Sequence, residues 1–160
     1  ITGRTSYSLS AFGEHLIGEE IENAVARAAG DIGAAVTDYA VGALFPGAAD
    51  GMGGGMEGGA GRHLFIVEFE GGPIEAARRE RFAVALDRFL AACNADYADH
   101  RAGDYGMRPP VVHAVPPGAF ARWMKSRGKL GGQNKVPRII NERSLLADLT
   151  TFMGFASPDR

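Results

Sequence analysis

Apolar residues recur along the chain with two different periods, and each period predicts a different kind of element. From Ile17 to Ala28 they fall three or four positions apart, and acidic residues occupy the start of the run. This is the pattern of an amphipathic helix whose first turn suits the positive end of the helix dipole. Gly30 and Gly33 follow the run and predict where the helix ends.

Strands of a sheet are predicted at four places: residues 3–9, 36–45, 63–70 and 111–115. The clearest is the third, because its apolar residues alternate, so that Phe65 and Val67 would face one side of the sheet and Leu64 the other. His63, at the start of this strand, is expected to be a surface residue and not a ligand.

Helical spacing returns in three later stretches: residues 73–101, residues 119–127 and a final helix that Asn141 is expected to cap. The first of these carries an apolar stripe made of Phe82, Leu86, Phe89, Leu90, Cys93 and Tyr97. Cys93 is therefore expected to be a buried structural thiol. In the short second helix, Phe120 and Trp123 are expected to anchor in the core, with the basic residues pointing outward.

Strands that alternate with helices predict an α+β fold, with a small sheet of about four strands and helices packed on it. One domain covers the whole chain, residues 1–160, with no internal repeat. Residues 46–61 contain eight glycines in sixteen positions, which predicts a hairpin loop. No lysine or serine follows at the spacing of a phosphate-binding loop, and the stretch carries two acids.

The composition is that of an ordinary globular protein, with 46% hydrophobic and 22% charged residues. A single cysteine excludes an internal disulfide framework, and no run approaches the roughly 18 apolar residues of a membrane span. The chain is therefore expected to be a soluble cytoplasmic protein that binds no membrane. It opens on Ile1 without a methionine, so we expect the 160 residues to be the C-terminal part of a longer polypeptide.

The net charge of −2 hides an uneven distribution. Residues 119–143 hold seven basic residues against one acid, which leaves ten basic and eighteen acidic residues, a balance of −8, in the rest of the chain. An acidic body would repel a nucleic acid backbone, so the basic segment indicates a local anionic ligand.

The basic segment is centred on the stretch Gly128-Lys-Leu-Gly-Gly-Gln-Asn-Lys-Val-Pro-Arg138. Its three glycines allow backbone conformations closed to other residues, and its two lysines and one arginine suit an anion. A solvated basic turn accounts for the composition equally well. The residues alone leave both interpretations open.

The same stretch, preceded by Val115-Pro-Pro-Gly-Ala-Phe-Ala-Arg-Trp123 and by Asn94-Ala-Asp-Tyr-Ala-Asp-His-Arg101, closely resembles the C-terminal end of the auxin-responsive Gretchen Hagen three family of acyl-acid amido synthetases, in its bacterial branch. Gly3-Arg4 and Phe12-Gly13-Glu14 resemble the hinge and the following loop of that family and of the wider acyl-adenylate-forming superfamily. The resemblance spans nearly the whole chain, and only the glycine-rich region 46–62 departs from it, as an insertion-like hairpin.

The resemblance implies the smaller, mobile lid domain of a two-domain ligase. Such enzymes use ATP and magnesium to turn a carboxylic acid into an acyl-adenylate, releasing pyrophosphate, and an amine, usually of an amino acid, then displaces AMP. The large N-terminal domain, absent from these residues, would bind most of the ATP, Mg²⁺ and acid and would be the partner of this domain. The fragment alone is expected to be inactive.

The resemblance also implies roles for individual residues. Lys135 matches the lid lysine and is the candidate catalytic residue. The candidate nucleotide-binding residues are Arg4, Lys129, Gln133 and Arg138. Gly13 and Glu14 match the loop that enters for the second half-reaction, where Glu14 would orient the incoming amine. No metal ligand is expected in this domain.

Two other functions stay open at this point. The segment 119–143 could belong to a stand-alone module that binds anions or nucleic acid, with Phe120 and Trp123 as stacking platforms. Helical spacing places those aromatics in a core, and the chain carries no RNA-binding signature, which disfavours this alternative. The chain could also be an interaction domain without chemistry, whose acidic body meets a partner.

Overall fold

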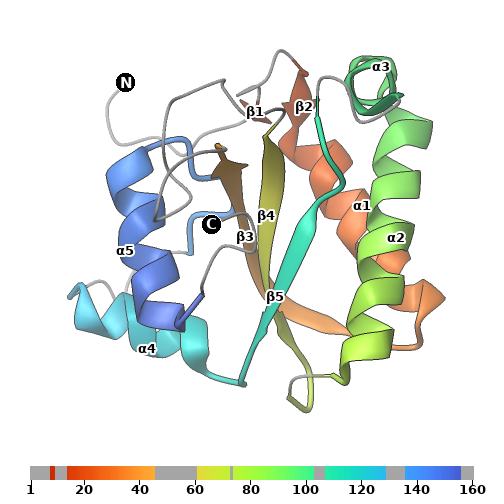
Figure 1. The fold of residues 1–160 in the computed structure, drawn as a ribbon. Coiled ribbons are helices and arrows are strands. Elements are labelled where there is room, and N and C mark those ends of the chain that lie inside the picture. Colours follow the sequence, from red (N-terminus) through yellow and green to blue (C-terminus); the bar gives the residue numbers. More distant parts are fainter. Residues whose placement is uncertain are drawn as a thin grey trace.

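A three-stranded sheet stands at the centre of the computed structural model, with helices on both of its faces (Figure 1). The structure describes residues 8–9, 14–45, 61–72, 74–102, 107–128 and 136–155. The sheet consists of β3 (Val36–Leu44), β4 (Arg62–Phe69) and β5 (Val111–Val115), in that order. β3 and β4 are antiparallel, whereas β4 and β5 are parallel.

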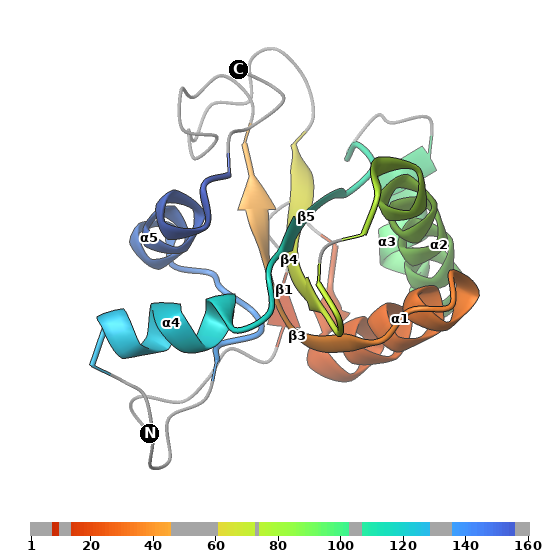
Figure 2. The ribbon, with the colours of Figure 1, turned by 90° about the horizontal axis from the view of Figure 1, so that it is seen from below.

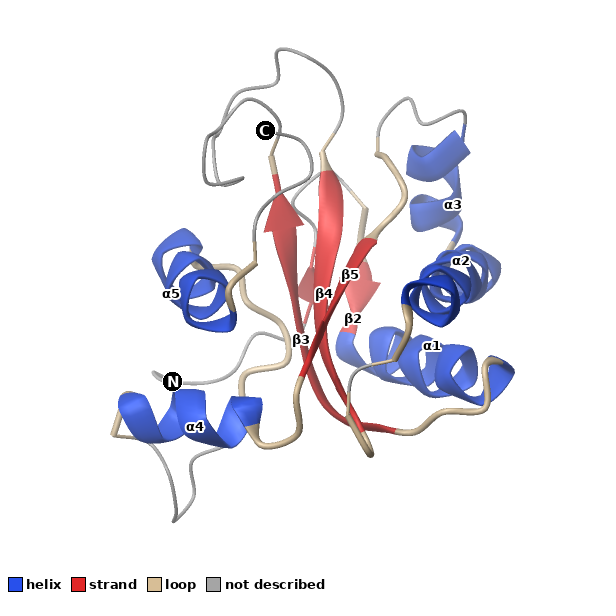
Figure 3. Ribbon diagram, turned by 60° about the horizontal axis from the view of Figure 1, so that its bottom comes forward, coloured by secondary structure: helices blue, strands red, loops and turns tan. Residues whose placement is uncertain are grey.

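The parallel pair requires a crossover, and two helices provide it. α2 (Ala76–Cys93) and α3 (Ala95–Arg101) lie between β4 and β5 in the chain. Together with α1 (Gly18–Asp31) they cover one face of the sheet. α4 (Ala119–Ser126) and α5 (Arg143–Met153) cover the other face, so the fold has three layers (Figures 2 and 3).

A second, two-stranded sheet pairs β1 (Ser8–Leu9) with β2 (Leu16–Ile17) in antiparallel register. Leu9 and Leu16 are buried in the same core as α1 and α2. This small sheet therefore fixes the early part of the described chain to the α1–α3 layer.

β4 separates two hydrophobic cores, because its successive side chains point to opposite faces. Phe65, Val67 and Phe69 lie in the core under α1–α3, and Leu64 and Ile66 lie in the core under α4 and α5. All five side chains are fully buried. The alternation predicted from the sequence is confirmed.

The α4–α5 layer approaches the sheet closely at Gly42 of β3. A Cβ atom at this position would lie 2.6 Å from Cδ2 of Leu146 in α5, closer than real Cβ contacts. A side chain at position 42 would therefore force the buried Leu146 side chain to move, so glycine suits the close approach of α5 to β3.

The α+β fold class is confirmed, but the predicted long helix 73–101 is wrong in its middle. Asn94 has extended backbone angles, φ −143° and ψ 111°, and its side chain accepts a hydrogen bond from the Tyr97 amide. Asn94 thus caps a new helix, α3, and the chain changes direction there. Cys93 is the last residue of α2 and is exposed, so the expectation of a buried thiol is wrong.

Two further expectations are corrected. Asn141 does not cap the last helix, since Glu142 is the N-cap, and the Asn141 side chain donates instead to the Ser8 carbonyl, 3.0 Å away. His63 is not a surface residue, because only 1% of it is exposed. The glycine-rich residues 46–60 and the first five residues of the predicted strand 3–9 lie outside the described ranges, which begin at Ser8. Among the described helices, none has the length and apolar character that a membrane crossing needs.

Candidate functional site

The two ends of the basic stretch 128–138 are anchored in the fold. On the entry side, α4 ends at Ser126, and Gly128 has a positive φ of 71°, which favours glycine. On the exit side, the amide of Val41 in β3 donates to the Arg138 carbonyl (2.8 Å), and the Ile140 amide donates to the Val41 carbonyl (2.9 Å). The exit therefore runs parallel to β3, along the edge that β4 leaves open.

The Arg138 side chain lies against two residues of β3. Its Nε is 3.4 Å from Oδ1 of Asp38, and its guanidinium carbon is 4.8 Å from the centre of the Tyr39 ring. Burial raises the pKa of Asp38, partly offset by the Tyr39 amide, which donates to Asp38 Oδ1, and by Arg138. Burial also raises the pKa of Tyr39. The guanidinium is thus oriented while 45% of the Arg138 side chain stays exposed.

A second carboxylate links this region to α4. Glu68 pairs with Asp38 across the β3–β4 ladder and accepts a hydrogen bond from the Thr37 hydroxyl (3.0 Å). Its other oxygen accepts from the Phe120 amide in the first turn of α4 (3.2 Å). Gly118, the N-cap, has no side chain to satisfy that amide, so Glu68 does so. We call Asp38, Glu68 and Arg138 the Arg138 cluster.

Another polar group is buried at the opposite end of the β3–β4 hairpin. Glu14 Oε2 lies 2.6 Å from Nε2 of His63, and neither side chain has more than 1% of its surface exposed. The His63 ring stacks on Tyr97 of α3, with ring centres 6.0 Å apart and an angle of 21° between the planes. Asn94 lies beside them and donates to the His15 carbonyl (2.6 Å). We call Glu14, His63, Asn94 and Tyr97 the Glu14 cluster.

Comparison with known proteins gives the family. A sequence model of the GH3 family C-terminal domain matches residues 19–144, more than half of the chain. The chain belongs to the GH3 family. A solved GH3.15 acyl acid amido synthetase matches it at 20% identity with a TM-score of 0.70, over 91% of this chain and 25% of that one. An AtGH3.15 acyl acid amido synthetase in complex with 2,4-DB matches at 19% identity and a TM-score of 0.66, over 92% and 26%. No curated protein matches.

At these identities the solved structures show that the fold is shared. The chain spans about a quarter of the length of those two synthetases. The resemblance to the C-terminal domain of the GH3 family, drawn from the sequence, is confirmed by the family match.

Most predicted site residues of this GH3 domain lie outside the described ranges: Arg4, Gly13, Lys129, Gln133 and Lys135. Arg138 and Glu14 are described, and they lie apart. Asp38, which binds Arg138, and Ala43, which pairs with His63, are five residues apart on β3, or roughly 17 Å along a strand. Glu68 and His63 also face opposite sides of β4, so the two clusters belong to different layers.

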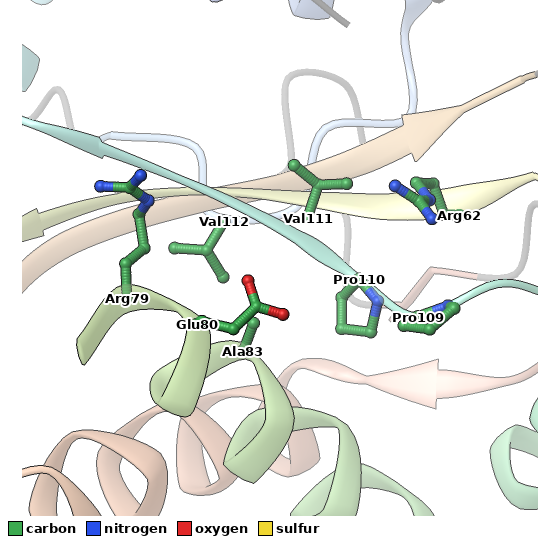
Figure 4. Close-up of a pocket in the computed structure, with 8 residues that line it drawn as sticks. All are labelled: Arg62, Arg79, Glu80, Ala83, Pro109, Pro110, Val111 and Val112. Atoms are coloured by element: carbon green, nitrogen blue, oxygen red, sulfur yellow. The ribbon is translucent and has the colours of Figure 1, made fainter. Parts of the chain in front are cut away.

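A pocket of about 330 Å³ lies at the other edge of the sheet, between α2 and the start of β5 (Figure 4). Arg62 and Arg79 stand at its two ends, with Glu80 between them and Val112 on the strand side. Of the predicted site residues, the structure describes Glu14 and Arg138, and neither lines this pocket. We therefore take the Arg138 cluster as the candidate functional site of this GH3 domain.

Sequence reasoning missed Asp38, Glu68 and the role of His63. The alternation of β4 could have placed Glu68 on the face of Leu64, but its contact with α4 depends on the tertiary fold. Within the described residues, no three His, Cys, Asp or Glu side chains come together as a metal site would require.

Proposed function

We propose that this GH3 domain is the mobile C-terminal part of an ATP-dependent acid–amine ligase that forms an acyl-adenylate and then an amide. The observation that carries the proposal is the family match, which spans residues 19–144 and so includes the whole basic segment. The absent N-terminal domain would be the partner of this domain and would hold the acid.

The reaction proceeds in two displacements. A carboxylate oxygen of the acid attacks the α-phosphorus of ATP, and the bond to pyrophosphate breaks. The nitrogen of an amine, such as that of an amino acid, then attacks the acyl carbonyl, AMP leaves with the bonding electron pair, and the amine loses a proton. The products are an amide, AMP and pyrophosphate.

The basic loop suits the first displacement. Negative charge grows on the phosphoryl oxygens in the transition state, and a cation placed beforehand stabilises that charge more than it stabilises the ground state. Lys135 supplies this charge, and Lys129, Gln133 and Arg4 contact the nucleotide. Arg138 offers a planar guanidinium group with hydrogen-bond donors in a fixed arrangement, and Asp38 and Tyr39 already orient it.

The chemistry of these side chains fits the anionic nucleotide better than the metal. Lysine and arginine bind phosphate oxygens, whereas Mg²⁺ is bound by carboxylates together with phosphate oxygens. As the family resemblance implies, Mg²⁺ and most of the ATP would be held by the N-terminal domain. The proposal places the enzyme in the cytoplasm, with neither nucleic acid nor membrane as a partner.

The full-length protein tests the proposal through acid-dependent ATP–pyrophosphate exchange over a panel of carboxylic acids. Lys135→Ala is expected to abolish exchange and leave folding intact. Lys125→Ala is the matched control, because Lys125 is an exposed lysine on the nearby helix α4. The proposal would be contradicted if none of the acids supported exchange, or if Lys135→Ala kept full exchange.

No second function is favoured. The nucleic-acid alternative needs Phe120 and Trp123 on the surface, but each is only 1% exposed, and the Trp123 ring nitrogen donates to Asp148. These aromatic rings cannot stack on bases. An interaction domain without chemistry would be favoured if nucleotide had no effect on the full-length protein.

A further inference from the structure

The pair Glu14–His63 is an acid and a base removed almost completely from water. Their exposed fractions are 0% and 1%, and the two atoms are 2.6 Å apart. The two side chains are joined by one short hydrogen bond between Oε2 of Glu14 and Nε2 of His63. Burial of such a pair is costly unless its geometry is well defined, so loss of one member should be destabilising. The position of Glu14 is therefore tightly coupled to that of His63.

His63 is itself held by strand pairing and by an aromatic ring. It opens β4 and pairs with Ala43 of β3. Its ring stacks on Tyr97, whose hydroxyl donates to Asp87 of α2 (2.6 Å). Asp87 is fixed in turn by two hydrogen bonds from Arg101 (2.8 and 2.7 Å). The imidazole thus has a defined orientation before it meets Glu14.

The chain directly after Glu14 is anchored at two more points. Asn94 donates to the His15 carbonyl and to Oε1 of Glu20 (2.8 Å). The same Glu20 oxygen accepts a hydrogen bond from the Ile17 amide (3.1 Å). The segment from Glu14 to Ile17 is thus fixed to α1, β4 and the α2–α3 junction.

We infer that His63 is a positioning residue for the amide-forming step, which it serves by fixing Glu14 and the segment from Glu14 to Ile17. This inference rests on the proposed function and on the resemblance of Gly13 and Glu14 to the loop of the second half-reaction. A carboxylate with no exposed surface offers nothing to an amine from solution. Glu14 therefore acts through the backbone that it anchors.

The location of the pair separates its effect from the first step. The Arg138 cluster lies roughly 17 Å away along β3, on the other face of β4. The cations proposed to act on the phosphates belong to the loop beside that cluster. Loosening the segment from Glu14 to Ile17 should therefore leave adenylate formation unchanged. It should slow attack by the amine, because a misplacement of about 1 Å can lower a reaction rate by a large factor.

The experiment compares both half-reactions in the full-length enzyme. His63→Leu removes the ring nitrogen that hydrogen-bonds Glu14, and His63→Gln keeps an amide nitrogen near the position of Nε2. In His63→Leu, acid-dependent pyrophosphate exchange is expected to stay within about threefold of wild type, and amide formation from preformed acyl-adenylate to fall at least about tenfold. The loss should lie in kcat and not in KM for the amine. His63→Gln should recover much of it.

His15→Gln is the matched control, because His15 is an exposed histidine next to Glu14, and it should change neither half-reaction. If His63→Leu does not fold, His63→Gln and Glu14→Gln carry the comparison. Equal losses in both half-reactions, an effect on KM alone, or unchanged amide formation would overturn the inference while the proposed function stands. A wild-type enzyme without acid-dependent exchange would overturn the proposed function, and with it the step assigned to His63.

Discussion

The Glu14 cluster and the Arg138 cluster contain similar groups in opposite environments. Glu14 and His63 are 0% and 1% exposed, whereas the side chains of Asp38 and Arg138 are 24% and 45% exposed. The first pair lies under the α1–α3 layer, and the second borders the α4–α5 layer. A buried pair fixes conformation, because no water can replace its partner, whereas a half-exposed pair keeps its charge available to a ligand. The domain thus carries one cluster suited to holding the chain and one suited to meeting an anion.

The largest difference between the clusters should appear on removing one partner of the buried pair. Glu14→Ala leaves His63 buried beside an empty volume, so the free energy of unfolding should fall by about 3–5 kcal/mol. Urea unfolding, monitored by circular dichroism, measures this change. A loss below about 1 kcal/mol would place Glu14 in water and remove the contrast between the clusters.

The two layers should also differ in their tolerance of added volume. Gly42→Ala puts a methyl group where Leu146 of α5 already lies, 2.6 Å away, so it should cost about 1–3 kcal/mol. Adding Leu146→Ala should make the cost of Gly42→Ala much smaller, because the clash disappears. Additive losses in the double variant would show that α5 does not press on Gly42.

Alkaline pH should distinguish Tyr97 of the Glu14 cluster from Tyr39, which lies beside Arg138. Burial and the hydrogen bond to Asp87 raise the pKa of Tyr97 above its usual value of 10.0. A raised folded pKa gives stability that is fully present below the unfolded pKa and is lost progressively as the pH rises toward the folded pKa. The loss at pH 11 is about 1.4 kcal/mol. In the wild type, the free energy of unfolding should fall between pH 9 and pH 11 as the unfolded Tyr97 loses its proton. In Tyr97→Phe this contribution is missing, so the free energy of unfolding should fall less steeply over the same pH range.

Tyr39→Phe serves as the comparison in this experiment. Burial raises the pKa of Tyr39 too, but the charge of Arg138 acts against that rise. The slope should therefore change less in Tyr39→Phe than in Tyr97→Phe. Identical slopes in wild type and Tyr97→Phe would show that the Tyr97 hydroxyl is not buried against Asp87.

The smallest effect should come from Asp38→Asn. Because burial raises the pKa of Asp38, its stabilising contribution is present below its usual pKa and lost as the pH rises through the folded value. Its ionised form therefore costs stability at neutral pH, which offsets the contact with Arg138. The free energy of unfolding at pH 7 should change by less than about 1 kcal/mol. A loss as large as that of Glu14→Ala would mean that the clusters are equivalent.

Local patterns predicted the parts of this fold that depend on local order. The alternation of β4 identified both cores, and the helical stripes identified the packed faces of the helices. The break at Asn94 was missed although asparagine is a favoured N-cap, because the apolar stripe continues through Tyr97.

The Glu14 cluster could not be predicted, because its members are distant in sequence. Glu14 and His63 are 49 residues apart, and a histidine at a strand end is indistinguishable from a surface residue until its partner is placed. For Arg138, the sequence indicated an anion-binding role, whereas its contact with Asp38 depends on the path of the chain along β3.

The two polar residues of β4 also bear on how the domain avoids misfolding. His63 and Glu68 are five positions apart and therefore face opposite layers, and a strand that paired one residue out of register would turn each toward the wrong layer. Glu68 would then face Phe82 and the other apolar residues under α1–α3, and His63 would lose Glu14. Both errors leave a polar group without its partner, which is costly in a dry core. β4 thus penalises a misregistered sheet, because both polar residues would lie in the wrong layer of the folded domain.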